Sequence, residues 1–521
     1  MIYFLLEVKL IYGKKRIVCD IVIFPVMVAI IHSIYGRMRC EMAGKRQRNN
    51  RKRRSAKRLR VILLFELMIL LLVAGSYYLI ARSNKDGDNG KDNKQQVIDN
   101  QDGKKDKDKN VDENLSPEEL EALKEQERLE LAIKEREGLV EEAKKLTLSY
   151  DYDGAIELIK SYQGDEGGYE VYQTLVTAIN ELEEEKKSLV LYGGSYTSVT
   201  QFNHIFFHSL IADNSKAFDG DYDSVGYNMY MTTTTEFKNM MQSMYEDGYV
   251  LVSVHDLAKQ VEDENGKLKF VPGEIYLPEG KKPFVLSQDD VNYYDYMDGD
   301  GFASRIVIGE DGKPTCEMIL DDGSVVQGDF DIVPILDAFV EEHPDFSYKG
   351  AKGILALTGY EGSLGYRTDD PTSPTYEQDK ETVKEVAEVL KANGWEFASH
   401  SYNHRNMQDK SFDFIKKDTD RWLEEVGSLV GPTDILIFPY GVDIESTMGH
   451  YSSDKYHYLK ERGFNYFHGV DSKPWMHLKD DYVRMTRRPL DGQAMLEFPQ
   501  RLQDLFNLDE IIDPERPSKN W

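Results

Sequence analysis

Cysteine is scarce in this chain, with three residues among 521. Cys19 and Cys40 precede the apolar run at residues 61–81, and only Cys316 follows that run. If the part after the run is exported, it carries a single cysteine and cannot form an intramolecular disulfide. A disulfide framework is therefore excluded for that part of the chain.

Positive charge is scarce beyond the N-terminal region. Residues 1–82 hold 17 Lys and Arg against 4 Asp and Glu, whereas the remaining residues hold 47 against 88. The net charge is therefore +13 in the first part and −41 in the second, which gives −28 for the whole chain. Because an acidic surface repels phosphate backbones, we expect no nucleic-acid partner.

Long apolar runs are few, and the run at 61–81 has the length of a bilayer crossing. It contains one charged side chain, Glu66, and follows a basic stretch at 45–60. At about 1.5 Å per residue a helix of this length spans the hydrocarbon core, and the basic flank places residues 1–60 in the cytoplasm. We predict a single-pass anchor at 61–81 in the cell membrane, with the rest of the chain extracellular.

A cleaved signal peptide ending near Ala74-Gly75-Ser76 is the alternative for this run. It is disfavoured because the run is long and lacks a clear Ala-x-Ala site. A shorter apolar stretch at 21–31 contains Pro25 and is too short to span a bilayer. We expect translation to start at Met38 or Met42, so that residues 1–41 are a mis-assigned start.

The segment after the anchor changes from polar to helical composition. Residues 82–115 are rich in Asp, Asn, Lys and Gly with almost no apolar residue, which predicts a disordered linker. Three stretches with helical spacing, at 116–149, 152–162 and 169–186, then predict a small helical stalk over 116–187. One helical repeat of this kind is more typical of a spacer than of a partner-binding array.

Beyond residue 187, short apolar runs typical of strands alternate with stretches of helical periodicity. This alternation predicts an α/β fold with a parallel sheet. Two turn signals within 309–329 indicate a β-hairpin inserted before a helix at 332–342.

Two pairs of side chains carry most of the functional information. His400 and His404 are four residues apart, so a helical turn or a tight loop can aim both rings at one divalent cation. Asp289 and Asp290 end a short apolar run typical of a buried strand, and α/β folds place chemistry where strands end. The histidine spacing alone is more typical of surface or core histidines, but the carboxylates supply the third ligand that a metal site needs.

These motifs, with Pro439-Tyr440-Gly441 after the apolar run 435–438, resemble the polysaccharide deacetylases of the NodB-homology (carbohydrate esterase 4) family. The family's motifs are Thr-Phe-Asp-Asp, His-Ser/Thr-x-x-His and Arg-x-Pro-Tyr-Gly, in the same order. The resemblance implies a distorted (β/α) barrel at 277–510, with lead-in strands and a helix at 188–276. It also implies metal-dependent hydrolysis of N-acetyl groups from a peptidoglycan-like polysaccharide that contains N-acetylglucosamine, in the cell envelope or outside the cell.

The resemblance assigns a role to each motif residue. Asp290, His400 and His404 would hold a divalent metal ion, for which zinc is the leading choice and cobalt an alternative. Asp289 would act as the general base, and the backbone N–H of Tyr440 would help hold the oxyanion.

Three features depart from the family pattern. Gln288 replaces the phenylalanine of the first motif, which alters packing more than chemistry. Ile437 replaces the arginine of the third motif, which in the family steadies the base, and Arg487 or Arg488 is a candidate substitute. No histidine occurs after His477, so the general acid of the fifth motif is missing from its usual place.

The candidate substitutes for the acid are His208, His468, His477 and water. His208 ends an apolar run that resembles the family's lead-in strand, although a core or strand-end position is more usual for such a histidine. The alternative function is therefore a catalytically weakened, metal-holding carbohydrate-binding protein of the cell surface. Candidate substrate contacts are Pro439, the fourth-motif-like Asp471 and Trp475, and Tyr293, Tyr294 and Tyr296, which either stack on sugar faces or pack internally.

Overall fold

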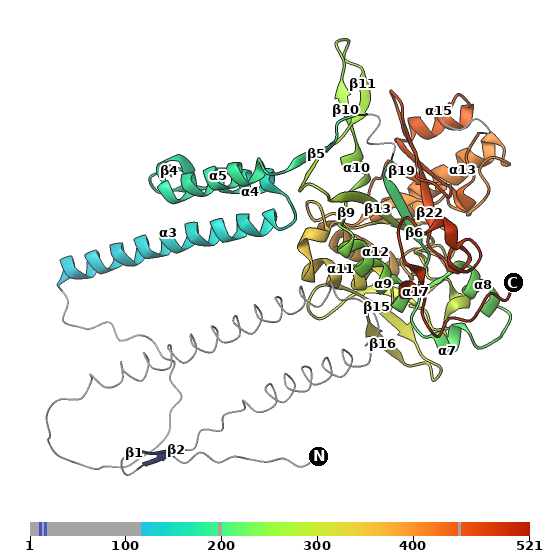
Figure 1. The fold of residues 1–521 in the computed structure, drawn as a ribbon, viewed down its shortest axis with the longest axis horizontal. Coiled ribbons are helices and arrows are strands. Elements are labelled where there is room, and N and C mark those ends of the chain that lie inside the picture. Colours follow the sequence, from blue (N-terminus) through green and yellow to red (C-terminus); the bar gives the residue numbers. More distant parts are fainter. Residues whose placement is uncertain (1–9, 13–14, 18–115, 196–200, 446–449) are drawn as a thin grey trace, which may run out of the picture. The chain divides into compact units, whose positions relative to one another are not determined.

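The computed structural model describes residues 10–12, 15–17, 116–195, 201–445 and 450–521 (Figure 1). The chain divides into two compact units, Met1–Val111 and Asp112–Trp521. In the first unit β1 (Leu10–Tyr12) pairs antiparallel with β2 (Lys15–Ile17). The predicted anchor and linker lie outside the described residues, among which no helix is both long and apolar enough to cross a bilayer.

Three helices form the predicted stalk: α3 (Pro117–Thr147), α4 (Tyr152–Lys160) and α5 (Gln173–Lys186). α3 begins with a capping box, in which Glu119 N–H donates to Ser116 Oγ and the Glu119 carboxylate accepts from Ser116 N–H. Side chains from all three helices form one apolar cluster. The third helix begins at Gln173 instead of Tyr169, because β3 (Gln163–Gly164), β4 (Gly167–Gly168) and the 3-10 helix η1 (Tyr169–Val171) occupy the preceding residues.

Seven parallel strands close into a barrel, which confirms the predicted distorted (β/α) barrel. Their order is β13-β17-β18-β19-β20-β22-β6, and β6 pairs back onto β13. The strand β13 branches, because its first residues pair with β9 (Tyr249–Leu251) and its last residues pair with β17. The barrel strands are β6 (Asn203–Phe207), β13 (Lys282–Gln288), β17 (Ile354–Leu357), β18 (Glu396–Ser399), β19 (Ile435–Ile437), β20 (Tyr466–Val470) and β22 (Val483–Pro489).

Helices cover the outside of the barrel (Figure 1). In β13 every residue after Lys282 is buried, as expected for a strand covered on both faces. On α9 (Thr234–Glu246) the side chains of Phe237, Met240 and Met244 join the apolar core. The other long helices are α11 (Ile332–Glu342), α12 (Tyr376–Ala392), α13 (Phe412–Trp422), which continues through the π-helical η4 (Leu423–Gly427) into α14 (Ser428–Val430), and α15 (Asp454–Glu461).

Several short pairings extend the barrel. Within the predicted lead-in segment, β5 (Val190–Gly193) pairs with β12 (Glu274–Leu277) outside the barrel. β10 (Ala258–Glu262) and β11 (Leu268–Pro272) form a hairpin, β7 (Leu210–Ile211) pairs with β8 (Thr232–Thr233), and β21 (Met476–Leu478) adds antiparallel to β22. The remaining short helices are α7 (Asn214–Ala217), α8 (Ser224–Tyr230), α10 (Val254–Leu257), η2 (Asp295–Met297), η3 (Pro344–Phe346), η5 (Pro439–Gly441), α16 (Gly492–Leu496), η6 (Pro499–Arg501) and α17 (Leu508–Ile511).

The insertion after β13 contains a three-stranded sheet instead of a single hairpin. β14 (Arg305–Ile308), β15 (Pro314–Ile319) and β16 (Val325–Gly328) run antiparallel to their neighbours. Both predicted turns form, with Gly312 and Gly323 at φ values of 80° and 78° that favour glycine. The helix that follows, α11, has the predicted limits.

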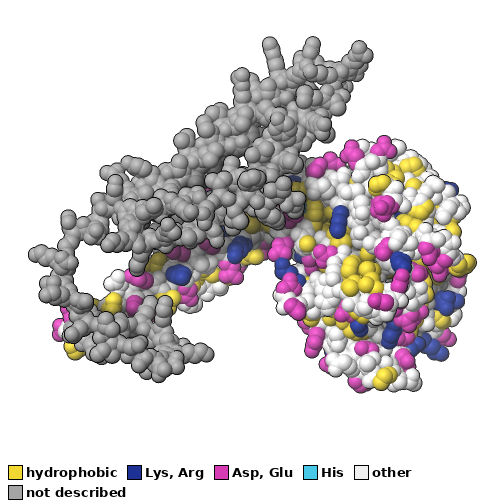
Figure 2. Space-filling view, turned by 90° about the horizontal axis from the view of Figure 1, so that it is seen from below, with side chains coloured by type: hydrophobic (Ala, Val, Ile, Leu, Met, Phe, Trp, Pro, Cys, Tyr) yellow, Lys and Arg dark blue, Asp and Glu magenta, His cyan; other side chains and the backbone are white. Residues whose placement is uncertain are grey.

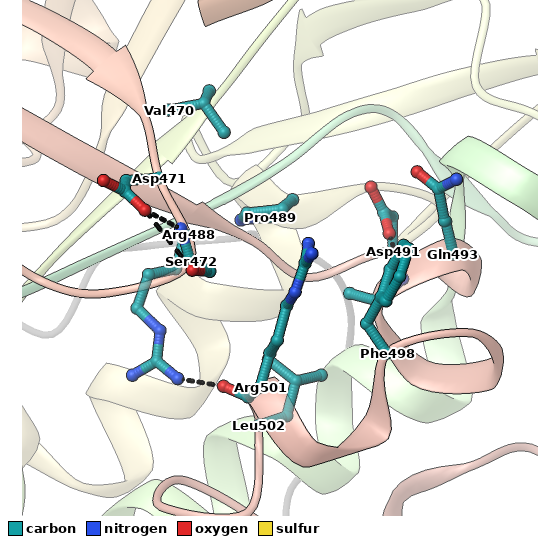
Figure 3. A pocket seen from close by; sticks show the side chains of 11 residues that line it. Val470, Asp471, Ser472, Arg488, Pro489, Asp491, Gln493, Phe498, Arg501 and Leu502 are labelled. Atoms are coloured by element: carbon teal, nitrogen blue, oxygen red, sulfur yellow. Dashed lines mark hydrogen bonds between the residues drawn. The ribbon is translucent and has the colours of Figure 1, made fainter.

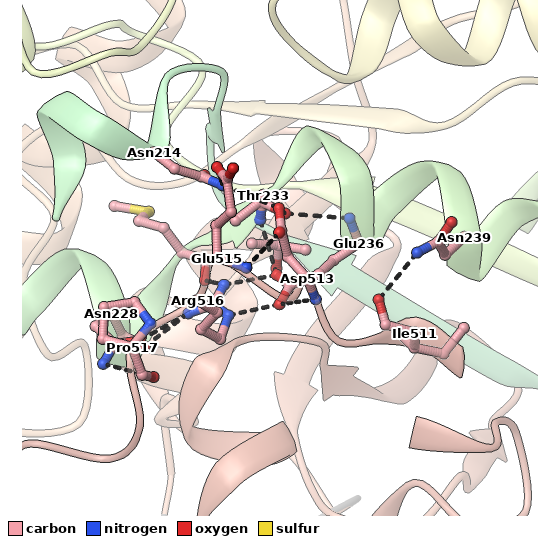
Figure 4. Close-up of polar contacts among 12 residues, drawn as sticks. Asn214, Asn228, Thr233, Glu236, Asn239, Ile511, Asp513, Glu515, Arg516 and Pro517 are labelled. Atoms are coloured by element: carbon pink, nitrogen blue, oxygen red, sulfur yellow. Dashed lines mark hydrogen bonds and ion pairs between the residues drawn. The ribbon is translucent and has the colours of Figure 1, made fainter. Parts of the chain in front are cut away.

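The C-terminal segment is fastened to α8 and α9 by buried polar contacts (Figure 4). Arg516 forms an ion pair with Glu236, and both side chains are fully buried. Asp513 accepts a hydrogen bond of 2.9 Å from Thr233 Oγ1. Over the face shown in Figure 2, acidic and basic side chains are interspersed.

At the N-terminal end of the barrel strands, His255 on α10 bridges two carboxylates. Its Nδ1 lies 2.5 Å from Glu396 Oε1, and its Nε2 lies 2.9 Å from Asp434 Oδ1. Burial lowers the pKa of His255, but the two carboxylates outweigh burial and raise it to about 10. The imidazolium therefore ties the beginnings of β18 and β19 to α10.

We expect this bridge to stabilise the fold at neutral pH and to be lost in alkali. The folded pKa of about 10 is above the ordinary value of 6.5, so the stabilisation is fully present below pH 6.5 and falls as the pH rises through about 10. In denaturant titrations the free energy of unfolding of His255→Gln should fall furthest below wild type between about pH 5 and pH 6.5, and the two should converge in alkali. His457→Gln, at an exposed position of α15, serves as the control, and a pH-independent loss in His255→Gln would contradict the bridge.

Candidate active site and metal centre

The two adjacent aspartates follow the last residue of β13 and differ in exposure. Asp289 is held by a hydrogen bond of 2.8 Å from its N–H to the carbonyl of Phe207 on β6, and 4% of its side chain is exposed. Asp290 has a left-handed backbone (φ 57°), and 19% of its side chain is exposed. One carboxylate is therefore enclosed in the barrel while its neighbour reaches the mouth.

The two histidines lie on a loop after β18, which is the second of the two predicted alternatives. Ser401 and His404 have left-handed backbones, with φ values of 56° and 46°. Asp418 on α13 holds this loop, because its carboxylate accepts from the N–H groups of Tyr402 and Asn403 at 2.8 and 3.1 Å. The spacing of the two histidines does not predict that Asp418 holds their loop.

Asp290, His400 and His404 are brought together, with ligand atoms that all lie within 4.8 Å of one another. His400 Nδ1 lies 2.9 Å from the carbonyl of Ile437, so it carries the proton and leaves Nε2 free to bind a metal. Burial lowers the pKa of His404 to about 4, which keeps its ring neutral near neutral pH. One carboxylate oxygen and two neutral imidazole nitrogens suit zinc, cobalt or a similar divalent ion.

Arg487, on β22, forms a bidentate ion pair with Asp289. Its Nη1 and Nη2 lie 2.5 and 2.9 Å from the two carboxylate oxygens, and 1% of its side chain is exposed. Burial raises the pKa of Asp289, but the Arg487 guanidinium outweighs burial and lowers it to about 2. Of the two arginines considered, Arg487 therefore pairs with Asp289, whereas Arg488 pairs with Asp504.

Further polar side chains line the barrel interior beneath this ion pair. Arg487 Nη1 also donates to Ser287 Oγ at 3.2 Å, and His204 Nε2 lies 3.0 Å from the same oxygen. The ring of His468 lies 5.0 Å from that of His204, and both rings are fully buried. Burial lowers the pKa of His468 well below its ordinary value, so the ring is neutral.

The third motif forms the short 3-10 helix η5, with Pro439 buried at its first position. Tyr440 has a left-handed backbone (φ 59°), and its ring lies 4.6 Å from that of His404. Because Tyr440 is in the first turn, its N–H has no acceptor within the helix. Gly441 is required beside it, since a Cβ atom there would lie 2.5 Å from Val470.

A pocket of about 510 Å³ opens onto these groups. It is lined by Asp289, Asp290, both ligand histidines, Tyr440 and Arg487, and also by His208, which directly follows β6. Of the three histidines considered as the acid, His208 reaches this pocket, whereas His468 is buried in the barrel and His477 is exposed on β21.

Asp471, one of the two fourth-motif-like residues, lines a second pocket that adjoins the first. This pocket of about 250 Å³ is lined by Asp471, Arg488, Asp491 and Arg501 among others (Figure 3). Trp475 Nε1 donates to Asp471 Oδ2 at 2.9 Å. The two pockets share Val470, Pro489, Asp491 and Gln493, so Asp471 lies beside the pocket that contains Asp289.

A family comparison covers part of the barrel and two residues of the aspartate–histidine cluster. Residues 371–466 match the family model for polysaccharide deacetylase. This segment contains His400, His404 and the third motif, and for it the match confirms the relationship that the motifs predicted. The match supports deacetylation of a polysaccharide.

A search of curated proteins found no match. Among solved structures, the deacetylase PplD of Streptococcus pyogenes in complex with acetate is 13% identical, with a TM-score of 0.31, and the similarity covers 57% of this chain and 97% of that one. A de-N-acetylase from Aggregatibacter actinomycetemcomitans is 13% identical with a TM-score of 0.34, over 58% and 99%. The fold assignment rests on the barrel topology itself.

Removing Arg487 should destabilise the protein strongly. Arg487→Met leaves the Asp289 carboxylate buried without a countercharge, and loss of one partner of a buried pair typically costs about 3–5 kcal/mol. Denaturant unfolding should show a loss of that order in the free energy of unfolding. Adding Asp289→Asn to Arg487→Met removes the buried charge and should recover much of the loss, and a double variant no more stable than the single one would contradict the pairing.

Proposed function

We propose that this protein is a metal-dependent deacetylase that hydrolyses N-acetyl groups of an N-acetylglucosamine-containing polysaccharide. The observation that carries the proposal is the pocket in which an ionised carboxylate, Asp289, lies beside the three metal-ligand groups of Asp290, His400 and His404. The family match supports a polysaccharide as the substrate. A polysaccharide of the cell envelope or of the surrounding matrix fits the predicted extracellular position of the body.

A divalent ion held by Asp290, His400 and His404 would polarise the amide carbonyl and lower the pKa of a water molecule. Asp289 then accepts the proton of the attacking water, since its carboxylate stays ionised beside Arg487. The ion pair fixes the direction of Asp289 because it is bidentate. The same ion pair makes Asp289 a weaker base. Arg487 therefore holds the carboxylate in a fixed direction but reduces its affinity for a proton.

The Tyr440 N–H supplies a donor for the oxygen that becomes negative when the amide carbonyl is attacked. Its position in the first turn of η5 leaves the N–H free of the helix's own hydrogen bonds. A preorganised backbone donor of this kind stabilises the oxyanion without reorganising during the reaction.

His208 donates a proton to the leaving amine nitrogen. It lines the same pocket as Asp289 and His404, and its buried Nδ1 has no hydrogen-bond partner among the described residues. His208 and Arg487 thus occupy the two roles that the family motifs leave empty at their usual places. This favours an active enzyme over the weakened carbohydrate-binding protein.

The two carboxylates should separate metal binding from turnover. Asp289→Asn is expected to lower acetate release from an N-acetylglucosamine oligomer by about 10²- to 10⁴-fold while the divalent ion is retained, because Asp289 moves a proton and does not hold the ion. Asp290→Asn should lose both. Elemental analysis and acetate assays on the same samples make the comparison, and near wild-type turnover in Asp289→Asn would rule out its role as the base.

The role of His208 as the general acid can be tested separately. His208→Gln should lower turnover by about 10²- to 10⁴-fold and remove the alkaline limb of the pH–rate profile. His477→Gln, at the exposed position on β21, is the matched control and should keep both. If His208→Gln turned over like wild type with its alkaline limb intact, another group would be the acid.

A further inference from the structure

An aromatic stack lies beside the metal-ligand group of Asp290. Tyr294 and Tyr296 come from the insertion after β13, and Tyr360 comes from the loop after β17. The ring of Tyr294 lies 5.9 Å from that of Tyr296 with planes at 14°, and 5.2 Å from that of Tyr360 with planes at 13°. These separations and angles are typical of offset-stacked rings.

Exposure increases outward along this stack. Tyr294 is 7% exposed, whereas Tyr296 is 56% exposed. The third tyrosine of the insertion, Tyr293, is buried, and its hydroxyl donates to Asp331 at 2.6 Å. Of the three tyrosines considered from the sequence, Tyr296 alone presents much of its ring to solvent.

Contacts from Arg367 hold the two loops of the stack together. Its Nη2 donates to the carbonyl of Tyr293 at 2.7 Å, and its Nη1 donates to the carbonyl of Glu361 at 2.6 Å. Arg367 also forms an ion pair with Asp295, directly before Tyr296. The exposed ring is therefore fixed before any ligand arrives, which lowers the entropy cost of binding.

Tyr294, the middle ring of the stack, connects the stack to the candidate metal site. The Tyr294 hydroxyl donates to Asp290 Oδ1 at 2.9 Å and lies 3.4 Å from Thr358 Oγ1. One side chain thus separates the exposed ring of Tyr296 from a metal-ligand carboxylate. A polymer whose acetyl group reaches that carboxylate has a neighbouring unit close to Tyr296.

We infer that Tyr296 forms a subsite for a second sugar ring of the same polysaccharide, next to the unit that loses its acetyl group. This inference rests on the proposed function. A pyranose ring presents a flat face of C–H groups to the negative face of an aromatic ring, while its hydroxyl groups stay in water. The carboxylates of Asp290, Asp223 and Glu361 all act electrostatically on Tyr296, so the surroundings suit an uncharged sugar and repel an acidic one.

The test is a binding measurement on the inactive full-length protein that carries Asp289→Asn together with Arg487→Met, so that it does not depend on turnover and leaves neither buried charge without a partner. Adding Tyr296→Ala should weaken calorimetric binding of an N-acetylglucosamine oligomer about three- to tenfold, the range expected for loss of one ring stack. Binding of the monosaccharide should not change. Tyr296→Phe keeps the ring and should bind the oligomer normally, and Tyr276→Ala, at a partly exposed tyrosine of β12, serves as the matched control.

The outcomes separate the subsite from the proposed function. Unchanged oligomer affinity in the Tyr296→Ala protein would overturn the subsite. Weaker binding accompanied by loss of the divalent ion would also overturn it, because Tyr296 would then act only by supporting Asp290. Failure of the wild-type protein to release acetate would contradict the proposed function, while the affinities would still decide the subsite.

Discussion

The buried pair of Asp289 and Arg487 is the interaction on which the arrangement of the site depends. The two side chains are 4% and 1% exposed, and each charge removed from water costs several kcal/mol unless it is paired and hydrogen-bonded. The bidentate contact, with Ser287 as a further acceptor, pairs both Nη groups of Arg487. It joins β13 to β22, the two strands that flank β6 in the barrel.

With Asp289 fixed inside the barrel, the neighbouring Asp290 is directed to the mouth by its left-handed backbone. Such a conformation typically costs about 1–3 kcal/mol for a residue other than glycine, and it recurs at Ser401, His404 and Tyr440. Each loop is held by specific contacts, such as those from Asp418 to the histidine loop. The rest of the fold thus offsets strain that is concentrated where the ligands converge.

Much of the barrel and of the ligand set could be predicted from the sequence, because both depend on local patterns. The limits of α11 follow from its periodicity, and Asp290, His400 and His404 follow from motifs at strand ends. From the sequence, the ion-pair partner of Asp289 could be limited to Arg487 or Arg488, but the sequence did not decide between the two. Adjacent residues of a strand face opposite sides, so the choice needs the register of β22, which no local pattern supplies. The convergence of His208 on the pocket likewise depends on the pairing of β6 with β13.

In the proposed function, hydrolysis depends on a divalent ion held by Asp290, His400 and His404. The most direct measurement is acetate release from an N-acetylglucosamine oligomer by the full-length protein after treatment with a chelator, and again after zinc or cobalt is restored. We expect acetate release to fall to background on chelation and to return with about one divalent ion per chain. Undiminished release from protein that elemental analysis finds free of metal would contradict it.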